Sequence, residues 1–218
     1  IKKINEGYKA VELDIDGVFS NMLLLKKKKY AAMTISGRDA DGKLKYSRKT
    51  SGLDMVRRDW CPLSKEVSSY VLDRLLGGRS REDSVENIHT YLRGVGEKIQ
   101  DQVWEGFVMT KQLTKMPHEY SDAKSQPHVQ VAIRMIQANE PVQAGQEIQY
   151  IVVEGNTSSI ADRSMTPKEF LAAADAKIDF KWYLSTQIHP PITRLCEVIE
   201  GTDAARIADC LGKSFSIP

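Results

Sequence analysis

Four successive lysines follow three leucines in the run LLLKKKKYAAM, residues 23–33. No glycine, proline, asparagine or aspartate separates these charges from the apolar residues on either side, so the sequence predicts that the lysines lie inside a strand. In a strand, alternate side chains face opposite sides, with Lys28 and Tyr30 on one side and Lys27 and Lys29 on the other. A polyanion lying along the strand would explain both the density of charge and its position.

Two interpretations of the lysine run are open. Lysines on an exposed edge strand prevent other strands from pairing with it. Alternatively, lysines held on a strand can donate hydrogen bonds to the N3 and O2 acceptors of a DNA minor groove, which differ little between base pairs. The return to Tyr30-Ala31-Ala32 indicates a strand fixed at both ends and favours the second interpretation. Such a contact suits a protein that holds duplexes of any sequence.

Residues 52–61, GLDMVRRDWC, place two arginines among acidic and apolar residues. The charges either form surface ion pairs worth about 0–1 kcal/mol each, or Asp54 or Asp59 orients one guanidinium while the other binds a phosphate through two hydrogen bonds. The apolar residues around them indicate a held geometry. Arg57 and Arg58 are therefore candidate phosphate ligands.

Other polar groups are weaker candidates. Asp14 and Asp16 share one face of a predicted strand and could join a two-metal site, but a solvated pair or partners for nearby lysines is the favoured interpretation. Residues 111–115 (KQLTK) and 124–128 (KSQPH) supply lysine, hydroxyl and helix-start N–H groups, which position phosphates without reading bases. The four histidines have no metal-ligand spacing and are expected to be structural.

Composition indicates a globular chain with an uneven charge. The 218 residues are 41% apolar, enough to bury a core. Residues 1–60 carry a net charge of +6 and residues 61–218 a net charge of −4. Three cysteines without CxxC spacing favour neither disulfides nor a zinc site, and fit a reducing compartment. No apolar run reaches the roughly 18 residues of a membrane span, no signal peptide is recognised, and the start at Ile1 indicates a fragment of a longer protein.

The hydrophobic pattern changes near Gly52, and the predicted fold is α+β. Before it, strands are predicted over 8–19, 22–35 and 43–50, the first two forming a hairpin through Ser20-Asn21. After it, apolar residues recur at helical spacing. Helices are predicted over 63–76, 80–104, 127–137, from 166, over 180–199 with a break at Pro190-Pro191, and over 202–211, with a strand over 147–154. A small antiparallel β portion, 1–50, thus precedes a mainly helical part, 51–218, with an inserted β ribbon.

Six blocks resemble, in order and spacing, the family B DNA polymerases, and among them the alpha catalytic subunits. They are LDIDGVF (13–19), LLLKKKKYAA (23–32), GLDMVRRDWC (52–61), TKQLTK (110–115), QPHVQVA (126–132) and QIHPPITRLCE (187–197). The resemblance covers essentially the whole chain. It implies that residues 1–50 are the end of the palm domain and residues 51–218 the thumb domain.

The resemblance also implies roles for individual residues. Residues 27–30 match the KKRY-type motif that contacts the minor groove near the primer terminus, with Lys29 where many members carry arginine. Gly52 to Trp60 would face the primer at the junction of palm and thumb. Thumb positions expected near the duplex backbone are Lys111, Thr114, Lys115 and His128. Asp14 and Asp16 match acidic palm positions near the metal site.

The family's YGDTDS motif, with its catalytic aspartates, is missing from this sequence and is expected before residue 1. The resemblance implies a parent that extends primase-made primers by two-Mg²⁺ nucleotidyl transfer from a dNTP, in the nucleus, with primase and an accessory B subunit bound through other regions and no membrane. The chain alone is expected to grip primer–template DNA or RNA/DNA hybrid without catalysing this reaction. The alternatives are a delta-like or archaeal family B polymerase, a non-catalytic nucleic-acid-binding domain, and a basic protein-binding adaptor.

Overall fold

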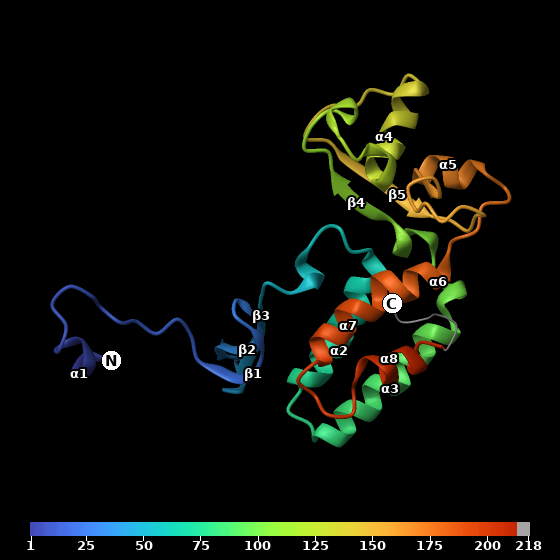
Figure 1. Ribbon diagram of the computed structural model, residues 1–218. Helices are drawn as coiled ribbons and strands as arrows, with labels where there is room; N and C mark the ends of the chain where they lie inside the picture. The colour runs from blue at the N-terminus through green and yellow to red at the C-terminus, as the bar shows by residue number, and fades with distance from the viewer. Residues whose placement is uncertain (213–218) are drawn as a thin grey trace.

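The computed structural model describes residues 1–212, which form the α+β fold that the sequence predicts (Figure 1). The strands are β1 (Phe19–Lys26), β2 (Lys29–Arg38), β3 (Leu44–Ser51), β4 (Met109–Gln112), β5 (Glu147–Val152) and β6 (Ser164–Met165). The α-helices are α1 (Lys2–Asn5), α2 (Pro62–Leu76), α3 (Arg81–Glu97), α4 (Pro127–Gln137), α5 (Pro167–Ala172), α6 (Phe180–Trp182), α7 (His189–Cys196) and α8 (Ala204–Cys210). Short 3₁₀ helices are η1 (Asp54–Val56), η2 (Ile99–Asp101), η3 (Trp104–Phe107), η4 (Pro117–Glu119) and η5 (Ala123–Ser125), and η6 (Tyr183–Ile188) is π-helical.

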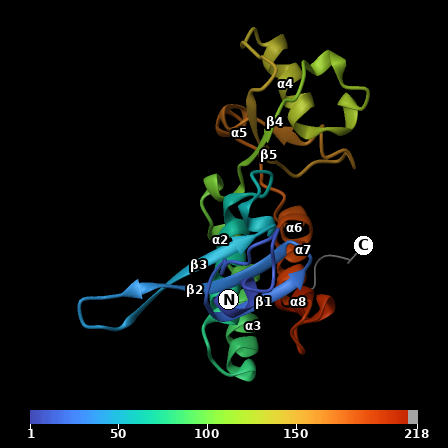
Figure 2. The ribbon, with the colours of Figure 1, turned by 90° about the vertical axis from the view of Figure 1, so that its left-hand side faces the viewer.

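The first sheet has the order β1-β2-β3, and its first hairpin turns within the lysine run. Leu23 pairs with Ala31 and Lys26 with Lys29, so Lys27 and Lys28 form the turn. The prediction that the lysines lie inside one strand is therefore wrong. Leu23 and Ala31 are both buried, and a strand register that points both into the core requires the chain to reverse at this place. Figure 2 shows β2 and β3 continuing beyond β1 as a long ribbon.

The strand predicted over 8–19 is also wrong, because regular pairing begins only at Phe19. Val11, Leu13 and Ile15 alternate with acidic residues but are 48–61% exposed. A strand needs a neighbour for its backbone N–H and C=O groups, and no described strand pairs with this segment. Figure 1 shows it running away from the rest of the molecule. The third predicted strand, by contrast, is present as β3.

The predicted helices are present, with two corrections at their ends. The helix predicted to reach Trp104 ends at Glu97, and η2 and η3 follow it. At its start, the Ser80 hydroxyl accepts a hydrogen bond from the Asp83 N–H at 3.1 Å, as the capping pattern predicts. Pro190-Pro191 does not break the last long helix. Instead the helix continues from the π-helical η6 into α7, and the wider π-helical turn just before the prolines accommodates residues that have no N–H to donate.

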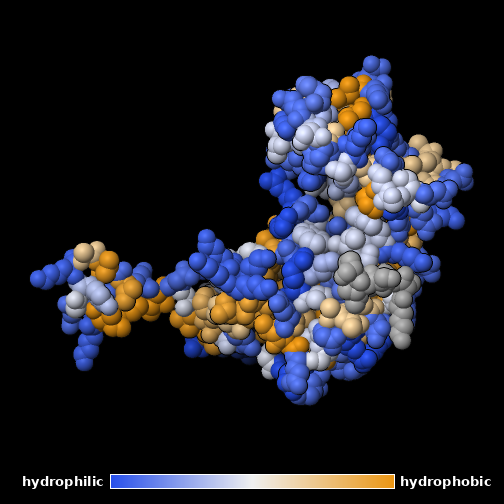
Figure 3. Space-filling model, in the orientation of Figure 1, coloured by the Kyte–Doolittle hydropathy of each residue, from blue (hydrophilic) through white to orange (hydrophobic). Residues whose placement is uncertain are grey.

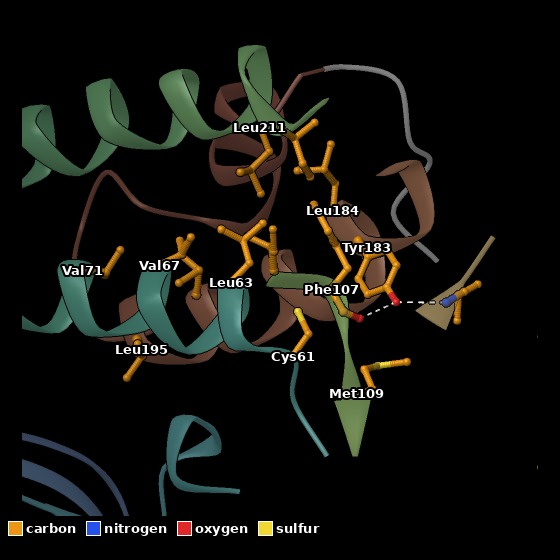
Figure 4. Close-up of a cluster of buried hydrophobic side chains, with 14 of the residues drawn as sticks. Cys61, Leu63, Val67, Val71, Phe107, Met109, Tyr183, Leu184, Leu195 and Leu211 are labelled. Atoms are coloured by element: carbon orange, nitrogen blue, oxygen red, sulfur yellow. Dashed lines mark hydrogen bonds between the residues drawn. The ribbon is translucent and has the colours of Figure 1, made fainter. Parts of the chain in front are cut away.

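The elements form two lobes. In the lower lobe, α2, α3, α7 and α8 pack together beside the β1-β2-β3 sheet, and in the upper lobe α4 and α5 accompany the β4-β5-β6 sheet (Figures 1 and 2). One hydrophobic core runs through both lobes. Tyr183 joins them: its buried hydroxyl donates to the Phe107 carbonyl at 2.7 Å and accepts from the Val152 N–H at 3.0 Å (Figure 4).

The three cysteines are buried and unpaired, so the described residues contain no disulfide. Burial raises the pKa of the Cys61 thiol to about 11 and that of Cys196 to about 12, which leaves both uncharged at neutral pH. Among residues 1–212, no helix has the length and apolar character that crossing a membrane requires.

Candidate nucleic-acid interface

The lysine turn, residues 26–29, is held by Ser51, the last residue of β3. The Ser51 hydroxyl donates a hydrogen bond to the Lys28 carbonyl at 3.3 Å. Lys28 itself has a φ of 64°, a left-handed conformation that brings the chain round in two residues. The side chains of Lys27 and Lys28 are exposed, while Lys29 and Tyr30 are half-buried. The strand pairing and this hydrogen bond therefore fix the backbone that carries the ammonium groups.

Glu197, the residue that follows α7, contacts the base of the lysine turn. The Lys26 ammonium lies 3.2 Å from a carboxylate oxygen of Glu197. Close by, Asp54 accepts a hydrogen bond from Arg194 at 2.5 Å, and the Arg194 guanidinium also lies over the Trp60 ring at 5.5 Å. Asp54 thus orients an arginine from a distant helix rather than Arg57 or Arg58. The sequence offers no signal for this pair because 140 residues separate its members.

Arg57 and Arg58 each have a carboxylate partner. Asp59 accepts two hydrogen bonds from Arg57, at 3.0 and 2.5 Å, and these bonds raise the pKa of the guanidinium. Arg58 pairs with Glu147 at the start of β5, a partner that the sequence does not reveal. Both arginine side chains remain more than half exposed. They are therefore oriented and still accessible to an anion.

Lys111 lies beside these arginines. It lines a shared hollow, here called the arginine hollow, together with Val56, Arg57, Arg58, Asp59, Thr110, Gln112 and Glu147. The hollow forms where the loop after η1 meets β4 and β5, so three segments that are far apart in the sequence contribute to it. Figure 3 shows hydrophilic residues over the concave side between the lobes. The fold thus gathers three predicted cationic residues on one surface.

Thr114 and Lys115 follow β4 and are held by Tyr120. The Thr114 N–H donates to the Tyr120 hydroxyl at 2.8 Å, and the Lys115 ammonium lies 5.0 Å from the centre of the Tyr120 ring. Leu113, between Lys111 and Thr114, is fully buried and anchors the segment. The exposed side chains of Thr114 and Lys115 are thus placed on the surface of the upper lobe.

His128 does not lie on this surface. Its side chain is 1% exposed, packs edge-on against Tyr120, and its Nδ1 has no hydrogen-bond partner among the described residues. Burial, aided by the charge of Lys111, lowers the pKa of His128 to about 4. A buried neutral imidazole is not a cationic phosphate ligand. The structure therefore supports the structural interpretation of His128 rather than contact with a duplex backbone.

Asp14 and Asp16 lie on the exposed N-terminal segment. Asp16 accepts a hydrogen bond from Lys49 at 3.1 Å, and Asp14 accepts one from the N–H of Ile15 at 2.7 Å. Within residues 1–212, no group of three or more His, Cys, Asp and Glu side chains is arranged to hold a metal ion. Asp16 is thus the partner of a nearby lysine, as the favoured interpretation expects, whereas Asp14 bonds only to its own backbone neighbour.

Comparison with known proteins agrees with the predicted resemblance. The family model of DNA polymerase family B matches residues 1–199. The chain is 44% identical over 212 residues to the DNA polymerase alpha catalytic subunit of Leishmania donovani, and 44% identical over 221 residues to that of Drosophila melanogaster. These alignments cover 96% and 97% of this chain, but the chain spans only 16% and 14% of those proteins.

A solved structure shows the same relationship. The family B DNA polymerase from the hyperthermophilic archaeon Pyrobaculum calidifontis superposes with a TM-score of 0.67 at 26% identity, over 93% of this chain and 24% of that one. Identity to the alpha catalytic subunits is higher than to this archaeal enzyme, which weighs against the archaeal alternative. The chain belongs to DNA polymerase family B and is similar over nearly its whole length to alpha catalytic subunits.

Proposed function

We propose that this chain holds the primer–template duplex in a DNA polymerase of the alpha type. The observation that carries the proposal is the lysine turn: clustered ammonium groups stand on a two-residue turn whose backbone is held by Ser51 and Gly52. Hydrogen-bond donors in fixed register can contact minor-groove acceptors without reading the sequence. The relatives are named as catalytic subunits of DNA polymerase alpha, and a contact of this kind suits a polymerase because it does not depend on the base sequence.

The arginine hollow extends the proposed contact to the phosphates. Arg57, Arg58 and Lys111 gather there on an accessible surface, and arginine suits the two oxygens of a phosphate. Residues 1–50, with the lysine turn, would then be the end of the palm domain and residues 51–218 the thumb domain. When the duplex is held between these groups, the end of the primer lies in position for reaction. This positioning is the proximity contribution to catalysis.

We further propose that the parent enzyme transfers a nucleotide from a dNTP to a primer, using Mg²⁺ held by residues other than those described. In this proposal, the duplex is an RNA-primed one made by primase, the accessory B subunit binds elsewhere, and the enzyme works in the nucleus. An RNA/DNA hybrid is A-form-like and presents a wide, shallow minor groove with 2′-hydroxyls. The exposed two-residue turn suits a shallow groove of that kind.

The test compares two triple variants that remove the same charge. In the first, Lys27, Lys28 and Lys29 are changed to alanine. In the control, Lys168, Lys177 and Lys181 are changed, since these lysines lie in or near α5 and α6, away from the lysine turn. Fluorescence anisotropy gives the Kd for an RNA-primed duplex at several salt concentrations.

The first variant should bind at least about tenfold more weakly, and the slope of log K against log salt should fall by up to about three. The control should stay close to the unmodified protein. Equal losses in the two variants would mean that net charge, not the lysine turn, governs binding. Absence of salt-dependent binding in the unmodified protein would favour the protein-binding adaptor.

A further inference from the structure

Residues 53–60, here called the linking segment, connect the first sheet to α2. They follow Gly52, which lies against the Lys28 carbonyl, and they carry Arg57 and Arg58 of the arginine hollow. In the described part of the chain, the backbone hydrogen bonds of the linking segment lie within the segment itself. Contacts of its side chains must therefore fix its position relative to both groups of cations.

Arg194, on α7, contacts both ends of the linking segment. Near the first end, its Nε donates a hydrogen bond to a carboxylate oxygen of Asp54 at 2.5 Å. At the last residue, its guanidinium lies 5.5 Å from the centre of the Trp60 ring, which is a cation–π contact. The Asp54 side chain is only 12% exposed and Trp60 is half-buried, so solvent screens these contacts less than it screens a surface pair. One guanidinium thus bridges the stretch that carries Arg57 and Arg58.

The end of α7 contacts the lysine turn as well. Glu197 follows Arg194 by three residues, which is close to one helical turn, and lies 3.2 Å from the Lys26 ammonium. Helix α7 packs against α2 (Figure 1) and continues from η6, whose Tyr183 hydroxyl bonds to the Phe107 carbonyl. The lysine turn and the linking segment are therefore held by the same helix.

We propose that Arg194 is a positioning residue for the duplex. By holding Asp54 and Trp60, it fixes the linking segment and thereby sets the distance between the lysine turn and the arginine hollow, so that both meet one duplex. In this role Arg194 acts through Asp54 and Trp60 rather than through a phosphate. The effect on duplex binding rests on the proposed function, whereas the effect on the linking segment does not.

Asp54→Asn distinguishes positioning from direct contact by the sign of its effect. Asparagine keeps the shape of the side chain but removes the charge that holds the guanidinium. If Arg194 bound a phosphate itself, the loss of this charge would free it and strengthen duplex binding. The positioning role predicts the opposite: the Kd for an RNA-primed duplex, measured by fluorescence anisotropy, should rise about threefold or more. A Kd that falls or stays unchanged would overturn the proposal.

Arg194→Gln and the double variant complete a mutant cycle. Arg194→Gln should also raise the duplex Kd about threefold or more. The double variant with Asp54→Asn should bind no more weakly than Arg194→Gln alone, because each side chain acts only through the other. Losses that add in the double variant would show two independent roles and would contradict the proposal.

Glu169→Gln is the matched control. It removes one carboxylate charge that pairs with Arg134 in the upper lobe, and glutamine can still cap the start of α5. It should leave the duplex Kd nearly unchanged. A loss equal to that of Asp54→Asn would assign the effect to any broken ion pair, and the specific role of Arg194 would be refuted.

The order of the linking segment is measured separately, in the absence of nucleic acid. Backbone order parameters from NMR relaxation should fall for residues 53–60 from about 0.85 toward about 0.6 in Arg194→Gln and in Asp54→Asn. They should not change in Glu169→Gln. Unchanged order parameters in Arg194→Gln would overturn the proposal, and so would lowered order parameters with an unchanged duplex Kd. If the unmodified protein does not bind the duplex at all, the proposed function fails, and the order parameters still decide whether Arg194 fixes the linking segment.

Discussion

The carbonyl oxygen of Lys28 lies against the Cα of Gly52, within the space that a Cβ at position 52 would occupy. Gly52 also has a φ of 61°, a conformation that residues with a Cβ adopt at a cost. This contact fixes the lysine turn to the start of the chain's helical part. The position of the ammonium groups therefore depends on the absence of a side chain at position 52, just after the neighbouring strand β3.

Gly52→Ala should lower both stability and duplex affinity. The new Cβ meets the Lys28 backbone and must displace the lysine turn, in addition to the cost of about 1–2 kcal/mol for a positive φ. Gly42→Ala is the matched control, because Gly42 has a φ of 78° and a Cβ added there would have nothing within 4 Å. Urea unfolding and duplex anisotropy should show a larger loss for Gly52→Ala in both measurements. Equal losses would mean that the contact with Lys28 has no consequence.

Glu147→Gln should strengthen duplex binding. It removes the negative charge that pairs with Arg58 in the arginine hollow, so the guanidinium becomes available to a phosphate. We expect a rise in affinity of about two- to tenfold at low salt and a salt slope steeper by up to about one. Glu200→Gln removes the same charge beside Arg81, away from the hollow, and serves as the control. Weaker binding by Glu147→Gln would show instead that Glu147 orients Arg58 productively.

Tyr183→Phe should destabilise the protein by about 1–3 kcal/mol. The change leaves the Val152 N–H and the Phe107 carbonyl without the buried hydroxyl that bonds both. Tyr46→Phe, at a side chain that is 49% exposed, should have almost no effect. Urea unfolding followed by circular dichroism gives both values. A Tyr183→Phe protein as stable as the control would indicate that the two backbone groups find other partners.

Stability should fall as the pH decreases from 6.5 toward 4. The pKa of His128 is lowered to about 4 in the folded chain, so in this range the unfolded chain binds a proton that the folded chain does not. His89 has a lowered pKa for the same main reason, burial, and contributes in the same direction. Well above about pH 6.5 neither histidine adds a pH dependence.

His128→Leu should reduce the pH dependence of the midpoint of urea unfolding between pH 4 and 6.5. His118→Leu, at an exposed histidine, should leave that dependence unchanged. A steep dependence that survives in His128→Leu would assign the effect to His89 or to the carboxylates.

The local pattern of apolar and capping residues was enough to predict many of the helices and strands. The helical spacing from Leu63 to Leu76 predicts α2, and Ser80 and Thr166 start α3 and α5 as hydroxyl caps do. These features depend on residues within a few positions of one another, so they can be predicted from the sequence alone. The same holds for the clustering of the lysines and for the two adjacent arginines.

The remaining features depend on contacts between distant segments. The lysine run becomes a turn because the strands on either side of it must both point apolar side chains into one core. The alternating residues from Tyr8 to Gly17 form no strand, because a strand requires a neighbouring strand, which the pattern of a single segment cannot provide. Arg58 meets Glu147 across 89 residues, and Arg194 meets Asp54 across 140. The sequence by itself determined which charges the protein carries and which elements it forms, whereas only tertiary packing decided where those charges stand, because packing joins residues that have no local relation.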